Sequence, residues 1–369
     1  RSAQGVTPPG LVLTSPTDPA WPAALALAAG RFQPLHFIDR PRGSVSAALS
    51  LEAGEALSSQ IQGFAQDSGL SWQTKGDDLD AITLCLNGPI KIKTAEQPRT
   101  FVALSDRLGR LGELGSGERW AWCGQITGDE PASVYRAMSA LFLETRSAWL
   151  FDGYPATSEW ASFDATVAAA TLRKGKIETI VHDTPKQGIT HWRLGALRPL
   201  DAGLIMVNTK GNVDFFDLTP GRAAPGDAPI LSRPAIVHFV HSWSLGRAGD
   251  RNTVGGRWLE RGAYAYLGSV QEPYLQAFVP TPSLANRLLA GLPWGVAARA
   301  DSGPALKLAL LGDPLITPSP SLFRSENALP IDGAALPAGI PPRLSALQFS
   351  PAPLPFTLRR PVHHPPPPD

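Results

Sequence analysis

The chain has 369 residues, of which 43% are hydrophobic, and this length and composition allow one large or two fused α/β domains with a sizeable core. Its 33 Lys and Arg residues against 32 Asp and Glu residues give a formal net charge of +1. This balance lacks the basic excess of nucleic-acid-binding proteins, and no apolar stretch approaches the roughly 20 residues of a membrane-spanning helix. We therefore predict no nucleic-acid partner and no membrane-spanning segment.

The first part of the chain, residues 1–147, alternates strand and helix patterns. Leu11 to Thr14 is an apolar strand, Trp21 to Ala29 is an alanine-rich helix with Pro22 in its first turn, and Pro34 to Ile38 is a second strand. This alternation predicts a parallel sheet. The further elements predicted in this part are a helix over 52–65, strands over 81–90 and 122–126, and a helix over 131–146.

Residues 148–318 repeat the alternation and form the predicted second half. The elements expected there are a strand over 148–152, a helix over 159–173, a strand over 177–182, a helix over 284–300 and a last strand over 305–311. Gly291 to Pro293 interrupt the fourth of these elements. Beyond Pro318 prolines recur among apolar residues, so residues 319–369 are predicted to form a proline-rich extended tail.

The centre of the second half holds three strand patterns that each end at polar residues. These patterns span 203–211, 234–244 and 263–274, and they deliver Lys210, the His241/Ser242 pair and Glu272 to their ends. Consecutive strand ends of this kind form the crevice in which open α/β sheets place their ligands. We therefore expect Lys210 to lie beside His241 and Ser242 at one edge of a mainly parallel sheet.

Two segments of this region resemble a known family. They are the run Gly262 to Val270 with Glu272-Pro273-Tyr274, and the later run Leu311-Gly312-Asp313-Pro314-Leu315. Both resemble the gingipain-type branch of the caspase-like cysteine peptidases, and more closely an uncharacterised family of exported bacterial proteins related to that branch. The resemblance implies an α/β, caspase-like fold with mainly parallel sheets flanked by helices, in two adjacent wound halves.

The resemblance also implies where the catalytic residues would stand. In these peptidases one strand ends in His-Gly, and the next ends in a small residue followed by the catalytic Cys. This chain has Lys210-Gly211 at the first place and His241-Ser242 at the second, so both catalytic residues are missing. We interpret the chain as a catalytically inactive peptidase-like protein; in the alternative, a hydrolase, Lys210 would activate Ser242 or Ser244.

No metal site or cofactor is predicted from the histidines and cysteines. His238 and His241 are three residues apart in a strand, so they point to opposite faces and cannot share one ion. Cys85 and Cys123 lie in strand-like runs of the first half, where two buried free thiols are favoured over a disulfide. Both cysteines are far in sequence from the inferred catalytic strands.

Four aromatic residues are candidate contact residues. Trp243 and Trp294 fall at loops or helix breaks, and tryptophan is enriched at protein interfaces. Phe349 and Phe356 lie in the tail, whose prolines and apolar side chains follow no period that would form a separate core. We therefore predict that the tail binds other protein subunits.

The chain starts at Arg1 rather than Met, which fits a processed N-terminus, although a shortened sequence would look the same. Together with the resemblance to exported proteins, this start predicts an extracytoplasmic location, periplasmic or exported. The leading hypothesis is a structural or interaction subunit of a larger extracytoplasmic assembly. The alternatives are the Ser/Lys hydrolase and a module that binds a peptide or small ligand in the cleft where the peptidases bind their substrates.

Overall fold

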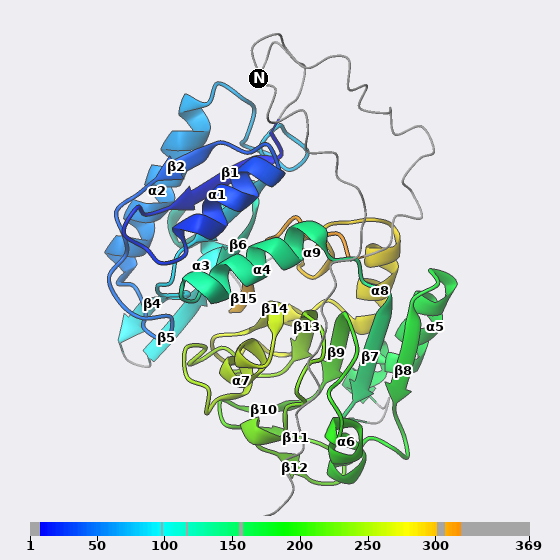
Figure 1. The fold of residues 1–369 in the computed structure, drawn as a ribbon. Helices are drawn as coiled ribbons and strands as arrows, with labels where there is room; N and C mark the ends of the chain where they lie inside the picture. The colour runs from blue at the N-terminus through cyan, green and yellow to red at the C-terminus, as the bar shows by residue number, and fades with distance from the viewer. Residues whose placement is uncertain (1–7, 97–98, 116, 155–157, 301–306, 319–369) are drawn as a thin grey trace, which may run out of the picture. The chain divides into compact units, whose positions relative to one another are not determined.

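Ten strands from both halves of the chain form one continuous sheet, in the order β2-β1-β3-β6-β15-β14-β13-β9-β7-β8 (Figure 1). The computed structural model describes residues 8–96, 99–115, 117–154, 158–300 and 307–318. The predicted tail, with Phe349 and Phe356, lies outside the described residues. Among the described helices, none is long and apolar enough to cross a bilayer.

The first half supplies four strands of the large sheet and a separate hairpin. Its elements are β1 (Gly10–Thr14), α1 (Trp21–Gly30), β2 (Leu35–Phe37), α2 (Leu51–Asp67), β3 (Ala81–Cys85), β4 (Lys91–Glu96), β5 (Arg99–Ala103), α3 (Leu104–Arg107), β6 (Trp122–Ile126) and α4 (Glu130–Phe142). Ser50 and Asp129 cap α2 and α4, and their side chains accept hydrogen bonds from the first-turn amides of Ala53 and Ala132. These caps fix where both helices begin.

The second half supplies the other six strands. Its elements are β7 (Ser147–Asp152), the 3₁₀ segment η3 (Ser158–Phe163), α5 (Ala165–Lys174), β8 (Glu178–His182), α6 (Ile189–Ala196), β9 (Leu204–Asn208), β10 (Lys210–Asn212), β11 (Phe215–Asp217), β12 (Arg222–Ala223), β13 (Ala235–Val240), α7 (Val254–Glu260), β14 (Ala263–Ser269), α8 (Thr281–Leu289), α9 (Trp294–Ala297) and β15 (Leu308–Leu311). Strands β10, β11 and β12 form their own small antiparallel sheet.

The strands of the two halves run in opposite directions. Within each half the sheet is parallel, as the sequence predicts, except for β15. Leu311 of β15 pairs in parallel with Gln125 of β6 and antiparallel with Tyr266 of β14. The carboxyl ends of the first-half strands therefore lie at the opposite edge of the sheet from those of the second half. The predicted halves thus share one sheet, and the boundary at residue 147 coincides with the start of β7 and stays a prediction.

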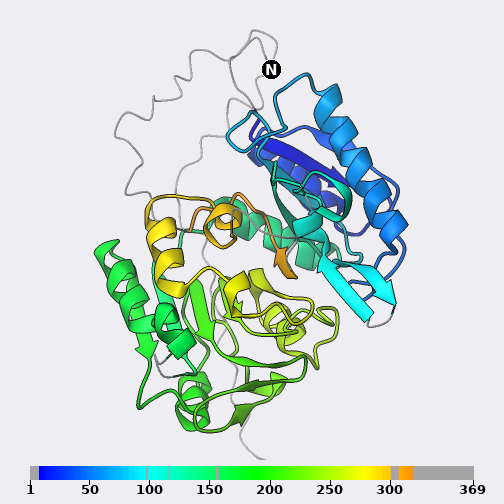
Figure 2. The same ribbon diagram turned by 180° about the vertical axis from the view of Figure 1, so that it is seen from behind.

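Helices cover both faces of the sheet, as Figures 1 and 2 show from opposite sides, and apolar residues of the strands pack against them. In β9, Leu204 and Met206 belong to the core beneath α5, α8 and α9, whereas Ile205 and Val207 belong to the core beneath α6 and α7. This alternation is the two-residue period of a strand that is buried on both faces. In the first half, α2 and α1 cover opposite faces in the same way.

A buried ion cluster connects the two halves. The carboxylate of Asp106, in α3, accepts hydrogen bonds from Arg110 Nε at 3.0 Å, from Arg299 Nη1 at 2.9 Å and from Arg119 Nη2. Arg299 follows α9 in the second half and also donates to Ser105 Oγ at 2.8 Å. Burial raises the pKa of Asp106, but the three guanidinium groups lower it further, so this carboxyl stays ionised.

The favoured interpretation of the cysteines agrees with the structure. Cys85 and Cys123 are free and fully buried. They lie on neighbouring strands, but Cys123 stands opposite Ile82 and Cys85 opposite Ile126. An offset of three residues places the two side chains on opposite faces of the sheet, so they cannot form a disulfide. Burial also raises the pKa of the Cys123 thiol to about 12.

The prediction for Trp294 is wrong. The sequence places this residue at a helix break and therefore at the surface, but Trp294 begins α9 and has 0% of its surface exposed. It packs in the same core as Leu284 of α8 and Leu310 of β15. A short helix after Pro293 returns the indole to the core, so Trp294 is a packing residue and not a contact residue.

Candidate functional site

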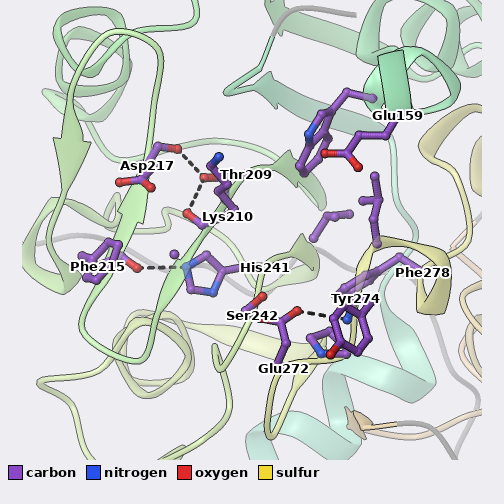
Figure 3. Close-up of a pocket in the computed structure, with 15 residues that line it drawn as sticks. Glu159, Thr209, Lys210, Phe215, Asp217, His241, Ser242, Glu272, Tyr274 and Phe278 are labelled. Carbon is purple, nitrogen blue, oxygen red and sulfur yellow. Dashed lines mark hydrogen bonds between the residues drawn. The ribbon is translucent and has the colours of Figure 1, made fainter. Parts of the chain in front are cut away.

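A cavity of about 420 Å³ lies at the carboxyl ends of β9 and β13 (Figure 3). These strands are neighbours and parallel, with Asn208 opposite Val240 in their last pair. Lys210 and the His241/Ser242 pair follow directly and all line the cavity. The structure therefore brings together the three residues that the sequence predicts at one sheet edge. Three carboxylates and an aromatic residue also line the cavity, which are Glu159, Asp217, Glu272 and Tyr274.

Lys210 opens the small sheet that forms one wall of the cavity. It pairs with Asp217 across the β10–β11 hairpin and is exposed to solvent. Its Nζ lies 5.0 Å above the centroid of the Tyr154 ring, and that ring stacks on Trp160 with centroids 4.9 Å apart. The ammonium group is thus placed against an aromatic surface.

Gly211 allows the β10–β11 hairpin and the His241 imidazole to approach each other closely. Its φ is +156°, and a Cβ at this position would lie 2.4 Å from the carbonyl oxygen of Phe215 and 2.6 Å from Nε2 of His241. No other residue type fits there without moving the hairpin or the imidazole. The glycine that ends the first strand pattern is therefore required by the contact between β11 and the loop after β13.

His241 is held as a neutral side chain. Its Nε2 lies 2.9 Å from the carbonyl oxygen of Phe215, and because a carbonyl only accepts, this nitrogen carries the proton (Figure 3). Burial lowers the pKa of His241 to about 4, although this hydrogen bond and the charge of Asp217 act in the opposite direction. At neutral pH the imidazole is therefore uncharged, and it holds the loop after β13 against Phe215.

Ser242 and Ser244 differ in access to the cavity. Ser242 is half-buried and lines the cavity. The structure does not support Ser244 as the alternative nucleophile, because this residue is fully buried and does not line the cavity. Its Oγ accepts a hydrogen bond from the amide of Ser269 at 3.2 Å. Ser269 Oγ in turn donates to the carbonyl of His241 at 2.8 Å. These two bonds fasten the loop after β13 to the end of β14.

The arrangement lacks the surroundings that a Ser/Lys pair needs. A lysine acts as a general base where an apolar environment removes water from its ammonium group. Lys210 is exposed instead. Among the described residues that line the cavity there is no cysteine, and Cys85 and Cys123 lie on β3 and β6 in the other half.

Tyr274, which lines the cavity, and Trp243, which follows the lining residue Ser242, have unusual backbone conformations. Trp243 has φ +62° and Tyr274 has φ +60°, in the left-handed region that side chains rarely adopt. The Tyr274 side chain is 65% exposed, and its amide donates to Glu272 Oε1 at 3.0 Å. Trp243 is only half-buried, so its surface remains available for contact. Strained residues of this kind concentrate at binding sites.

A buried polar network lies below the cavity, and the sequence analysis missed it. Asn208 Nδ2 donates to Asp152 Oδ2 at 3.2 Å, and Thr281 Oγ1 donates to Asn208 Oδ1 at 2.7 Å. Burial raises the pKa of Asp152 to about 7 despite hydrogen bonds from Ala165, Asn208 and Tyr154. Both Asp152 and Asn208 end apolar strands, so the strand-end rule that selected Lys210 would also have found them.

Comparisons with known proteins give a match in structure only. No family model matches the sequence, and no curated protein matches it. A solved structure described as "Structure of Protease" is 11% identical with a TM-score of 0.53, and the match covers 85% of this chain and 79% of that chain. The Arg-specific cysteine proteinase gingipain R (RGPB) is 10% identical with a TM-score of 0.55, over 85% of this chain and 80% of that chain. The chain has a gingipain-like, caspase-like fold.

The gingipain-like fold confirms the resemblance drawn from the segments around Gly262 to Tyr274 and Leu311 to Leu315. Most lining residues were not singled out from the sequence as site residues, and Glu159, Asp217 and Tyr274 are among them. Glu159 comes from η3, and Asp217 comes from a hairpin of very short strands. Neither element carries a periodic signal, whereas Tyr274 was part of the resemblance itself.

Proposed function

We propose that this chain is a noncatalytic peptidase-like protein that binds a polypeptide segment in the cavity after β9 and β13 without cleaving it. The proposal rests on the residues that stand at the two strand ends, where the peptidases have their catalytic residues. Lys210 is exposed at the first, and at the second His241 is bound to Phe215 beside Ser242. A peptidase of this fold needs a thiolate and an imidazole at these places. The cavity between them nevertheless remains open.

The charges of the cavity favour a ligand with a basic side chain. Glu159, Asp217 and Glu272 line it, and among the described lining residues Lys210 is the single cation. Arg222 already pairs with Asp217 at 2.8 Å, so Glu159 and Glu272 are the carboxylates that remain for a ligand. Arginine and lysine side chains bind such carboxylates with charge-assisted hydrogen bonds. The similar proteinase gingipain R is described as Arg-specific, which agrees with a basic ligand for this cavity.

The test combines turnover and binding on the full chain. Peptides with basic, acidic or apolar residues are incubated with the protein, and we expect no cleavage of any of them. A fluorescent basic peptide should bind in a polarisation assay, and Glu272→Gln should weaken binding by about tenfold. The matched control is Glu178→Gln, an exposed carboxylate at the start of β8 on the other edge of the sheet. Equal binding by both variants would contradict the proposal.

The hydrolase alternative has its own readout. If Lys210 activates Ser242, the purified protein cleaves or acylates with a peptide or ester substrate, and Ser242→Ala abolishes this turnover. Turnover that disappears in Ser242→Ala, but not in a Ser244→Ala variant that remains folded, would replace the binding proposal with the Ser/Lys mechanism.

We further propose that the protein works as an interaction subunit of an extracytoplasmic assembly, through the proline-rich residues 319–369. The support is the composition of that segment, together with the resemblance to exported proteins. All elements of the large sheet end by Leu311, so a chain shortened after Phe323 should keep its fold. Size-exclusion chromatography of complexes purified from the native source tests this role, since the shortened chain should elute alone. Normal assembly of the shortened chain would reject it.

A further inference from the structure

A second cavity, of about 590 Å³, lies at the opposite edge of the sheet from the first. It forms where the first-half strands β3 and β6 end, and Asn87 and Thr127 from these ends line it. The loop after β2 and helix α7 complete its walls. Because the two halves run in opposite directions, each half has its own crevice at the carboxyl ends of its parallel strands, which is the usual ligand position in such sheets. This volume is in the range of small-molecule sites.

Arg136 of α4 is the central cation of this cavity. Its side chain is only 9% exposed, and its Nη1 donates to the carbonyl oxygen and the hydroxyl of Thr127. Among the described residues, no carboxylate lies within ion-pair distance of its guanidinium group. Burial lowers the pKa of Arg136, although the charge of Asp129 acts in the opposite direction. The carboxylate of Asp129 already caps α4 through the amide of Ala132 at 3.0 Å.

Gly128 provides the space that this guanidinium occupies. Its φ is +109°, and a Cβ there would lie 2.8 Å from Arg136 Nη1. The backbone turn after β6 thus leaves room for the charged group at the end of the strand. A buried charge without a counter-charge is unfavourable, so its presence beside an open cavity favours a ligand of opposite charge.

The other charged lining residues increase the positive excess. Arg40 and Arg251 join Arg136 against one carboxylate, that of Glu260. Arg40 pairs with Asp18 at 2.9 Å, outside the lining residues. The Glu260 carboxylate lies 2.6 Å from Arg257 and 3.9 Å from Arg251, so its stronger ion pair is with Arg257. Arg136 and Arg251 are therefore the two guanidinium groups that remain for a ligand.

We propose that this second cavity binds a small organic molecule through a carboxylate or phosphate group held by Arg136 and Arg251. Guanidinium groups present paired N–H donors that match the geometry of both oxyanions. Asn87 lines the cavity beside them. Its Oδ1 accepts from the amide of Gly128 at 3.0 Å, which leaves the Nδ2 amide group to donate to the ligand. The site is independent of the first cavity and of any peptide that binds there.

Calorimetry with the full chain tests the proposal. Citrate and inorganic phosphate are titrated separately into the protein in chloride buffers of matched ionic strength. We expect one of them to bind with one-to-one stoichiometry and to raise the thermal unfolding midpoint, since a ligand that binds only the folded state stabilises it. Arg251→Gln should weaken binding by about tenfold. Arg146→Gln is the matched control, because these two arginines are 73% and 77% exposed and each lies near one glutamate.

Arg136→Met removes the buried guanidinium group and should abolish both the binding of citrate or phosphate and the rise in the thermal unfolding midpoint. Circular dichroism first establishes whether this variant is folded; if it is not, Arg251→Gln decides the question. Citrate identifies a carboxylate ligand, and phosphate identifies a phosphorylated one. Failure of both anions to bind the unaltered chain more tightly than chloride would overturn the proposal. So would equal binding by the Arg251→Gln and Arg146→Gln variants.

Discussion

Nε2 of His241 and the carbonyl oxygen of Phe215 lie 2.9 Å apart, and this contact joins the loop after β13 to the β10–β11 hairpin. It occupies the imidazole nitrogen that faces the hairpin, while burial keeps the ring neutral by lowering its pKa to about 4. Gly211 lies against both partners, so the three residues form one packed unit at the edge of the cavity. The histidine at the second strand end therefore has a structural explanation that does not involve catalysis.

His238→Leu should stabilise the protein, and more strongly at low pH. His238 is fully buried beside Phe278 and Trp294, and neither ring nitrogen has a hydrogen-bond partner among the described residues. Burial lowers its pKa from 6.5 to about 3. Between pH 6.5 and pH 3, His238 is protonated in the unfolded chain but not in the folded chain. The free energy of unfolding therefore falls as the pH falls from 6.5 toward 3.

The variant lacks this loss, so its advantage should grow by about 2 kcal/mol between pH 7.5 and pH 5. Urea unfolding of both proteins at the two pH values measures the difference. An advantage that is the same at pH 5 and pH 7.5 would show that His238 does not resist protonation in the folded state.

Asp152→Asn should have the opposite pH dependence. Burial raises the pKa of Asp152 from 3.8 to about 7, so the folded chain holds a proton that the unfolded chain releases in this interval. Stability from this group is present below pH 3.8 and is lost as pH rises through 7, by a few kcal/mol in total. The variant should therefore gain relative to the unaltered chain between pH 5 and pH 8.

Because the His238 and Asp152 intervals overlap with opposite sign, the pH profile of the unaltered chain alone does not separate them. The difference between Asp152→Asn and the unaltered chain, measured by urea unfolding across pH 5 to 8, isolates the carboxyl group. A flat difference would mean that Asp152 titrates at an ordinary value and that the network with Asn208 compensates for its burial.

Trp294→Ala should destabilise the protein by about 3 to 5 kcal/mol, because it leaves a large cavity in the core between α9 and β15. Trp243→Ala removes the same number of atoms from a half-buried position and should cost much less. Thermal unfolding of the two variants compares them directly. Similar losses would indicate that Trp243 is also a core residue and would withdraw it as a contact candidate.

Asp106→Asn should destabilise the protein by about 3 to 5 kcal/mol, because the buried guanidinium groups of Arg110, Arg119 and Arg299 would lose their shared counter-charge. The control is Asp201→Asn, whose carboxylate is 65% exposed and pairs with Arg233 at the surface. Exposed pairs contribute up to about 1 kcal/mol. Denaturant unfolding that gives equal losses for both variants would contradict the structural role of the cluster.

Sequence reasoning was most accurate where strands are buried on both faces. The apolar runs of β9, β13 and β14 end where their polar neighbours begin, so their carboxyl ends and the pairing of Lys210 with the His241/Ser242 edge could be predicted. The hairpin β4–β5 and the small sheet β10–β12 were missed. The strands of the small sheet have only two or three residues, which is too short to show a period. The fold class needed the resemblance as well as the periodicity.

Burial of single side chains was the least predictable property. Ser244 and Trp294 both sit in segments that read as turns, and tertiary packing buries them. The direction of β15 was equally hidden, because a strand's orientation depends on the path of the chain that leads into it and not on its own four residues. The second cavity shared this limit: Arg136 reads as one polar position of an amphipathic helix, and only the turn at Gly128 shows what surrounds it.

The position of β15 has a consequence for the order in which the chain assembles. A ribosome delivers β6 and β14 before Leu308 emerges, and each of these strands then has one partner, β3 or β13, and depends on β15 for its second. Until then each half carries an open sheet edge with unpaired backbone groups, and such edges invite pairing with other chains. The ten-stranded sheet is therefore complete only after the four-residue strand β15 has emerged. Chains that stall or terminate before residue 308 should be prone to aggregate through those two edges.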